Sequence, residues 1–270
     1  MNASKLLRFF EVRRAREEPL VLVTVSDTKG STYSKAGDQM LIDANGVACG
    51  MLSGGCLESD LAARAQVVSE SGDSQTVTYE LASEDDDVWG LGIGCDGSME
   101  IELRSITAQD DYSQFVRPVP VQLLVLGAGL DAVPLARLAV EVGWRGTIVD
   151  HRPAYIDNND IPSDFEKHCA EPSQLAATVN FDVYDFAIVM SHHLSSDREY
   201  LRQLADSSIP YVGLLGPPAR KERLLTELGE YASKISARLH GPAGLNLGGR
   251  GPEPIALSIL AEMQQLLPDD

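Results

Sequence analysis

A glycine-rich turn that leads into a cysteine is the part of this chain best suited to chemistry. Residues 50–58 read Gly-Met-Leu-Ser-Gly-Gly-Cys-Leu-Glu, and the apolar spacing that follows predicts Cys56 in the first turn of a helix. Glycines let the backbone approach a ligand, while helix-start amides and the helix dipole attract anions and stabilise a thiolate. A phosphate-bearing, sulfur-binding ligand would suit this site. In the simpler interpretation, Gly54 and Gly55 only make a tight turn and Cys56 is a small buried apolar residue.

A second cysteine lies in another glycine-rich stretch. Residues 89–97 read Trp-Gly-Leu-Gly-Ile-Gly-Cys-Asp-Gly, with glycines at every second or third position around Cys95. Such density is rare in an ordinary strand connection, although a flexible loop with a chance thiol is an equally open interpretation. We predict that the two loops form one binding site, with Gly54 and Gly55 holding phosphate and Glu58 orienting the loop. The residues assigned to this half of the site are Ser53, Gly54, Gly55, Cys56, Glu58 and Cys95.

A dinucleotide-binding signature opens the second half of the chain. The apolar run 121–126 leads directly into Gly-Ala-Gly-Leu-Asp-Ala at 127–132, the GxGxxA form of the fingerprint. A second strand ends at Asp150, about 20 residues after Gly129, where a carboxylate would bind a ribose hydroxyl. Asp131 places a negative charge where a phosphate would lie, and this argues against dinucleotide occupancy.

Two further polar residues belong to the candidate site in this half. His192 follows a strand at the edge where open α/β sheets bind ligands. Arg250 lies in the glycine-rich loop 241–251 and could clamp a phosphate or carboxylate with two hydrogen bonds. The alternatives are a loop-capping histidine and a surface arginine. We assign cofactor binding to Gly127, Gly129, Asp150, His192 and Arg250. We predict that Cys56 and Cys95 face one another across a domain cleft, and that His192 and Arg250 line this cleft from the Rossmann side.

The elements that must position these residues form an α/β protein. A small amino-terminal α/β domain is predicted from a helix at 4–16, strands at 20–25, 39–42 and 47–50, a helix ending near 70, and strands at 76–81 and 98–103. The Asp-Ala-Asn-Gly turn at 43–46 indicates a hairpin. Strands at 121–126, 146–149, 186–191 and 211–215, alternating with helices, predict a Rossmann-like, doubly wound and mostly parallel sheet. The predicted domains are 1–108 and 121–270, joined by a polar linker at 109–120.

Composition excludes several classes of function. The chain of 270 residues has 22 Lys and Arg against 40 Asp and Glu, a net charge of −18, so nucleic acid and anionic membranes would be repelled. The absence of a long apolar run and of a signal peptide predicts a cytoplasmic protein. Four cysteines without a CxxC pair indicate reduced thiols rather than zinc or disulfides. We expect no metal bound directly by the chain, and interpret the acidic run 84–87 as a solvated loop.

Taken together, these loops resemble a known family. The stretch from Gly30-Ser31-Thr32 through Gly37, Met40-Leu41 and residues 53–58 is similar to the amino-terminal domain of the XdhC/CoxI family, accessory proteins of molybdenum hydroxylases such as xanthine dehydrogenase. Residues 127–129, 150–153, 211–216 and 241–259 resemble its Rossmann domain in order and spacing. The resemblance covers most of residues 20–265. The chain departs from the family pattern at Asp131 and Ala132 in the fingerprint, and at Leu194, where a second histidine often follows.

The resemblance implies a maturation factor without turnover of its own. Such a factor binds molybdenum cofactor, as molybdopterin or its dinucleotide form, shields it while a terminal sulfido ligand is installed, and passes it to the hydroxylase. Cys56 would then lie near the molybdenum. The implied partners are a molybdenum hydroxylase client and a cysteine desulfurase-type sulfur donor. We also expect a homodimer, in which two compact halves could exchange domains.

Two other functions stay open at this point. The fingerprint and Asp150 are also typical of an NAD(P)-dependent oxidoreductase, in which His192 would act as acid and base. Cys49, Cys56 and Cys95 would alternatively suit a thiol redox sensor.

Overall fold

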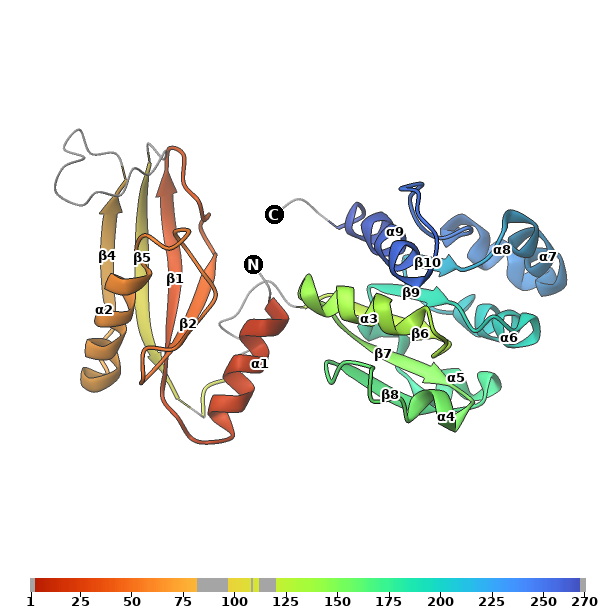
Figure 1. Ribbon diagram of the computed structural model, residues 1–270, viewed down its shortest axis with the longest axis horizontal. Helices are drawn as coiled ribbons and strands as arrows, with labels where there is room; N and C mark the ends of the chain where they lie inside the picture. Colours follow the sequence, from red (N-terminus) through yellow and green to blue (C-terminus); the bar gives the residue numbers. More distant parts are fainter. Residues whose placement is uncertain (1–2, 82–96, 108, 112–119, 268–270) are drawn as a thin grey trace. The chain divides into compact units, whose positions relative to one another are not determined.

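The chain folds into two compact units, residues 1–119 and 120–270, each with its own sheet (Figure 1). The computed structural model describes residues 3–81, 97–107, 109–111 and 120–267. Within those ranges, no helix combines the length and the apolar character needed to cross a membrane.

Unit 1 is built on an antiparallel sheet. Its described elements are α1 (Ala3–Arg14), β1 (Leu20–Lys29), β2 (Gln39–Asp43), β3 (Ala48–Cys49), α2 (Glu58–Ser71), β4 (Gln75–Glu80) and β5 (Ser98–Ile106). Five strands in this part of the chain pair in the order β3-β2-β1-β5-β4. The predicted hairpin is confirmed, because β2 pairs with β3 through Leu41 opposite Cys49 and Ile42 opposite Ala48.

Both faces of this sheet are covered, which explains the unbroken apolar run of β1. Alternate residues of a strand point to opposite faces. Val21, Val23 and Val25 pack in one cluster with Leu61, Ala65 and Val68 of α2. Leu20 and Leu22 belong to a second cluster with Leu6 and Phe10 of α1. The α2 cluster holds the start of that helix, and therefore the loop that precedes it, against the sheet.

Unit 2 is a parallel, doubly wound sheet. Its main elements in the described residues are β6 (Gln122–Leu126), α3 (Ala132–Glu141), β7 (Arg145–Asp150), α4 (Pro153–Ile156), β8 (Phe165–Cys169), α5 (Leu175–Thr178), β9 (Phe186–Val189), α6 (Leu194–Leu204), β10 (Tyr211–Leu214), α7 (Pro218–Leu228), α8 (Ala232–Ile235), β11 (Leu239–His240) and α9 (Pro252–Gln264). The strands pair in the order β11-β10-β9-β6-β7-β8, and every pairing is parallel. The predicted Rossmann-like fold class is confirmed.

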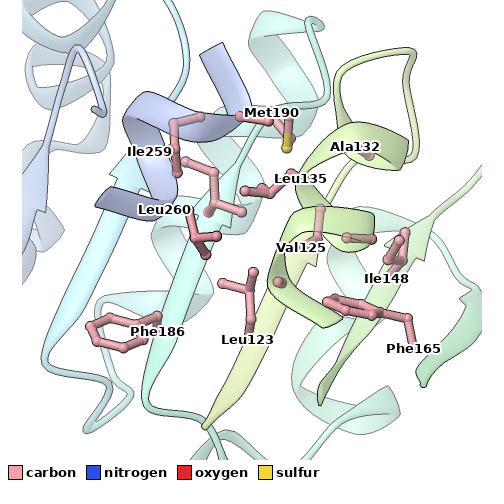
Figure 2. Close-up of a cluster of buried hydrophobic side chains, with 14 of the residues drawn as sticks. Leu123, Val125, Ala132, Leu135, Ile148, Phe165, Phe186, Met190, Ile259 and Leu260 are labelled. Carbon is pink, nitrogen blue, oxygen red and sulfur yellow. The ribbon is translucent and has the colours of Figure 1, made fainter. Parts of the chain in front are cut away.

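Helices cover both faces of the unit 2 sheet. On one face α3 and α9 lie side by side, and their apolar residues pack with Leu123, Val125 and Phe186 of the strands (Figure 2). On the other face α6 and α7 pack against alternate strand residues such as Leu124 and Leu126. The continuous apolar runs of these strands thus reflect burial on two sides, as expected for a parallel sheet.

The edge strand β8 has no counterpart among the predicted elements. Its sequence, Phe-Glu-Lys-His-Cys, buries only Phe165 and leaves the side chains that follow largely outside the core. A strand at the edge of a sheet needs one apolar anchor rather than an apolar run, so hydrophobic periodicity carries no signal for it.

Candidate functional site

The loop before α2 is fastened by the carboxylate of the first residue in that helix. Glu58 Oε1 accepts hydrogen bonds from the backbone N–H groups of Leu52 and Ser53, both at 3.0 Å, and Ser53 Oγ donates to Glu58 Oε2. Ser53 Oγ also accepts a hydrogen bond from the N–H of Leu57 at 2.7 Å. Burial raises the pKa of Glu58, but the hydrogen bonds from Ser53 and Leu52 outweigh it and hold the pKa below its ordinary value. The loop is therefore held at both ends by a charged carboxylate.

Between these fastened ends, three consecutive amides have no partner in the described part of the chain. The N–H groups of Gly54, Gly55 and Cys56 donate to none of its residues. The two glycines have φ angles of 74° and 112°, a conformation that side chains disfavour. Successive N–H groups in such a turn make an anion-binding concavity. Because the half-buried Cys56 thiol is carried on the same turn, the loop offers hydrogen-bond donors and a sulfur together.

The predicted position of Cys56 in the first helical turn is wrong by two residues. Helix α2 begins at Glu58, with Leu57 as its cap. Because Ser53 Oγ accepts from the Leu57 N–H, the turn continues through Cys56, and the first backbone bond of the helix joins Leu61 N–H to the Leu57 carbonyl at 2.9 Å. The amide of Cys56 thus belongs to the loop and is left free of the helix.

The segment 30–33 lies beside this loop. The ring of Tyr33, a residue that is 62% exposed, lies 3.7 Å from the point where a Cβ on Gly54 would stand. A Cβ on Gly97 would stand only 2.3 Å from the carbonyl oxygen of Lys29, so only glycine fits where the second glycine-rich stretch rejoins the sheet. Cys95 lies outside the described residues, and its part in the site stays a prediction.

Cys49 is set apart from Cys56 by its packing. It is half-buried in β3, against the apolar cluster formed with α1, and burial raises the pKa of its thiol. A thiol held in its protonated form reacts slowly with oxidants. The structure therefore argues against Cys49 as the reactive group of a redox sensor.

In unit 2, the fingerprint loop lies at the point where the strand order reverses. After β6 the chain adds β7 and β8 on one side of this strand. It then returns to the other side of β6 and adds β9 and β10 in the opposite direction. Open α/β sheets bind ligands at such a switch point. Gly127, with φ 115°, passes so close to the neighbouring loop that a Cβ would stand 2.5 Å from Ser191 Cα. The loop after β6 and the loop after β9 are thus in direct contact.

Asp150, the buried last residue of β7, holds the fingerprint loop by a hydrogen bond. Its side chain is 1% exposed; Oδ2 accepts from Ala128 N–H at 2.8 Å, and Arg152 donates to both oxygens through its guanidinium. Burial raises the pKa of Asp150, but the hydrogen bonds from Arg152 and Ala128 outweigh it and lower the pKa. A ribose hydroxyl, the partner predicted for this carboxylate, would have to compete with these bonds.

His192 lies beside the second glycine of the fingerprint, Gly129. Its Nε2 lies 2.7 Å from Asp131 Oδ2, and its ring lies 3.5 Å from the point where a Cβ on Gly129 would stand. The residue has φ 60°, which is uncommon for a side chain other than glycine. In the fingerprint, the second glycine is where the backbone approaches the pyrophosphate. In this chain an imidazole and a carboxylate stand at that approach.

A buried polar network that the sequence analysis missed supports this loop. Asp197, with 0% exposure, accepts hydrogen bonds from the Ser191 hydroxyl and from Arg220, whose Nε lies at 3.1 Å. Ser191 Oγ also accepts from His193 N–H at 3.2 Å. The sequence signal for this network was an acidic residue in the first turn of α6, which is common in helices for electrostatic reasons alone.

The structure brings some of the predicted residues together and leaves others apart. Gly127, Gly129, Asp150 and His192 meet at the crevice between β6 and β9. Arg250 lies on the loop between β11 and α9, is exposed, and pairs with no carboxylate among the described residues. In the same part of the chain, no three His, Cys, Asp or Glu side chains gather as metal ligands would. The predicted cleft between the two halves stays a prediction.

Several known proteins are similar to this chain over nearly its whole length. A protein of Bacillus subtilis named as a probable component of xanthine dehydrogenase is 29% identical, with 92% of this chain and 93% of that protein covered. The molybdenum cofactor insertion chaperone PaoD of Escherichia coli is 23% identical, over 96% of this chain and 86% of its own length. A crystal structure described as a xanthine dehydrogenase from Bacillus halodurans has a TM-score of 0.78 and 27% identity, covering 98% of this chain and 96% of that one.

Two family models match, one in each unit. The model of the XdhC Rossmann domain matches residues 123–263, which is more than half of the chain. The model of the XdhC and CoxI family matches residues 13–80, the part that holds the glycine turn and Cys56. With a two-sided parallel sheet in unit 2 and the fastened cysteine loop in unit 1, the chain belongs to the XdhC and CoxI family.

Proposed function

We propose that this chain is an accessory protein that binds molybdenum cofactor, protects it during sulfuration and delivers it to a molybdenum hydroxylase. The observation that carries the proposal is the loop in which the amides of Gly54, Gly55 and Cys56, unpartnered within the described residues, adjoin the Cys56 thiol. The names of the relatives from E. coli and B. subtilis, a cofactor insertion chaperone and a xanthine dehydrogenase component, support the same role.

The donor set of the loop fits the chemistry of this cofactor. The cofactor is a phosphorylated pterin whose dithiolene sulfurs bind molybdenum, so when bound it would bring an anionic phosphate and a sulfur-ligated metal to the site. The three amides would donate to an anionic oxygen or sulfur, and Cys56 would supply its sulfur beside them. Glu58 and Ser53 are positioning residues, because they fasten the turn without presenting their own oxygens as ligands. Carrying a group in this way needs no chemical step by the protein.

Partners and setting follow from the proposed role. A carrier that protects the cofactor during sulfuration needs a sulfur donor of the cysteine desulfurase type and a hydroxylase client. We place this exchange in the cytoplasm and expect the chain to act as a homodimer. The cofactor would bind as molybdopterin or as its dinucleotide form.

Loading with purified cofactor tests the proposal. The protein is incubated anaerobically with molybdenum cofactor and passed through gel filtration, and pterin fluorescence is measured in the protein fraction. We expect stoichiometric pterin in the wild type and in Cys169→Ser, which removes an exposed cysteine from unit 2, and a loss of at least about tenfold in Cys56→Ser. Equal pterin in both variants would remove Cys56 from the site. No pterin in any of the three proteins would refute the carrier role.

The oxidoreductase alternative gains no support from the crevice. His192, the predicted acid and base, already pairs with Asp131, and Asp150 already holds Ala128 and Arg152. No observation in the described residues favours this second function over the first.

A further inference from the structure

Unit 2 contains an open pocket away from the fingerprint loop. It has a volume of about 600 Å³ and is formed by the turn after β10, the loop between β11 and α9, and the first turns of α9. Pockets of this size hold small organic ligands in many proteins. The pocket lies at the carboxyl edge of the sheet, because the segments that form it follow β10 and β11. These two strands lie at one end of the strand order, so the pocket is separate from the point where β6 and β9 end.

One part of the pocket wall is apolar. Leu215, Leu245 and Ile255 line it, and Leu247 lines it while remaining 53% exposed. An exposed leucine at the mouth of a pocket offers a surface on which a flat ring can lie. This part of the wall suits an apolar or ring-bearing part of a ligand, such as a heterocyclic base.

The other part of the wall is backbone with free donors. Gly216, Gly248 and Gly249 line the pocket, and their N–H groups donate to none of the described residues. Arg250 is not itself a lining residue, but it follows Gly249 directly in the chain, is exposed, and has no carboxylate partner within the described ranges. In a chain with a net charge of −18, an arginine left without a carboxylate beside free amides makes a local site for an anion.

The pocket is held in shape by hydrogen bonds from α9. Glu262 of that helix accepts from the Gly244 N–H, and from the Tyr211 hydroxyl at 2.8 Å. Leu245 N–H donates to the Ser258 carbonyl at 3.1 Å, which ties the loop to the helix a second time. A loop fixed in this way loses little conformational entropy when a ligand binds.

We propose that this pocket binds a nucleoside phosphate, with the base against the leucine wall and the phosphate on the glycine amides and Arg250. The fingerprint crevice is a poorer place for such a ligand, because Asp131 and His192 stand over Gly129. The proposal does not depend on the proposed cofactor loop, since that loop lies in unit 1. The same chemistry is offered by a free nucleotide and by the nucleotide end of a dinucleotide cofactor.

Calorimetric titration of the full chain with GMP, CMP, AMP and guanosine tests this site. We expect one site per chain for at least one nucleotide, and at least about tenfold weaker binding of the matching nucleoside, which lacks the phosphate. Arg250→Ala should weaken binding by about tenfold or more, and Leu247→Asp should abolish it. Arg223→Ala is the matched control, because Arg223 is an exposed arginine of α7 that pairs with Glu227, and it should change nothing.

A parallel titration with the dinucleotide form of molybdenum cofactor separates the two sources of the ligand. Binding of a free nucleotide assigns the pocket to free nucleotides, whereas binding of the dinucleotide cofactor alone assigns it to the nucleotide end of that cofactor. Binding that survives Arg250→Ala but is lost in Gly129→Leu would place the ligand in the crevice and overturn the proposal. Absence of binding by nucleotide and dinucleotide cofactor alike, with the circular dichroism of the folded protein intact, would overturn it as well.

Discussion

The glycine loops of the two units are both fastened by hydrogen bonds to a carboxylate, but they lie beside different groups. Each is fastened by a carboxylate with a lowered pKa that accepts two backbone N–H groups. Glu58 accepts those of Leu52 and Ser53 in the loop before α2, whereas Asp150, at the end of β7, accepts that of Ala128 in the fingerprint loop and that of Arg152 after β7. No basic side chain in the described residues pairs with Glu58, whereas Arg152 neutralises Asp150. The unit 1 loop keeps three amides free of the described residues beside a thiol. The unit 2 loop also has amides, at Gly129, Leu130 and Asp131, that donate to none of the described residues, but the Asp131 carboxylate and the His192 imidazole stand beside them. The two loops therefore differ in the groups that stand beside their free donors, a thiol in unit 1 and a carboxylate with an imidazole in unit 2.

Removing the two carboxylates should give the largest difference between the loops. Asp150→Asn leaves the Arg152 guanidinium beside a neutral amide, and we expect a loss of about 3 kcal/mol in the free energy of unfolding. Glu58→Gln keeps the shape and leaves no unpaired charge, so we expect about 1 to 2 kcal/mol. Urea denaturation followed by circular dichroism measures both. Equal losses would contradict the idea that Arg152 distinguishes the loops.

The same pair predicts a pH dependence. Both groups have a folded pKa below the ordinary value, so their stabilisation is fully present above the pKa of the unfolded chain and is lost as pH falls through the folded pKa. The differences between wild type and each variant should be constant near pH 7 and shrink below about pH 4. A difference that grows on acidification would show that the sign is wrong.

Alanine substitutions at two glycines with nearly the same φ distinguish the cost of backbone strain from the cost of a steric clash. Gly127 and Gly55 have φ angles of 115° and 112°, but a Cβ on Gly55 meets nothing within 4 Å, whereas one on Gly127 meets the Ser191 backbone at 2.5 Å. We expect Gly55→Ala to cost about 1 kcal/mol and Gly127→Ala about 2 to 3 kcal/mol. Thermal unfolding of the two variants makes the comparison. Equal costs would mean that the loops after β6 and β9 separate easily.

The smallest effect on stability is expected when the contact between Asp131 and the His192 imidazole is broken. Asp131→Asn breaks a partly exposed ion pair and should change the free energy of unfolding by less than about 1 kcal/mol. It also removes a negative charge from the approach to Gly129, so affinity for NADH should rise by about threefold to tenfold. Fluorescence titration of NADH against the wild type and this variant tests the second effect. An unchanged affinity would mean that Asp131 does not obstruct the crevice.

Local patterns were sufficient for most of the fold. The apolar runs of β1 and β6, the turn at 43–46 and the spacing of Leu61, Ala65 and Val68 each lie within a few residues, and each predicted its element correctly. Strand β8 was missed because a single residue, Phe165, anchors it at the sheet edge. Helix α2 was placed two residues early, because the capping hydroxyl is that of Ser53, four residues before Leu57.

Features that depend on neighbouring residues could be predicted from the sequence, whereas features that depend on contacts between distant residues could not. The sequence by itself determined which glycines, cysteines and acids stand in the loops, because turn and strand preferences are local. Only the tertiary structure decided which groups stand beside each loop: His192 meets Asp131, Asp197 meets Arg220, and Glu262 meets Gly244, each across a separation that no periodicity encodes. Such contacts arise from chain packing, since a polar group that leaves water must find a partner wherever the fold places one.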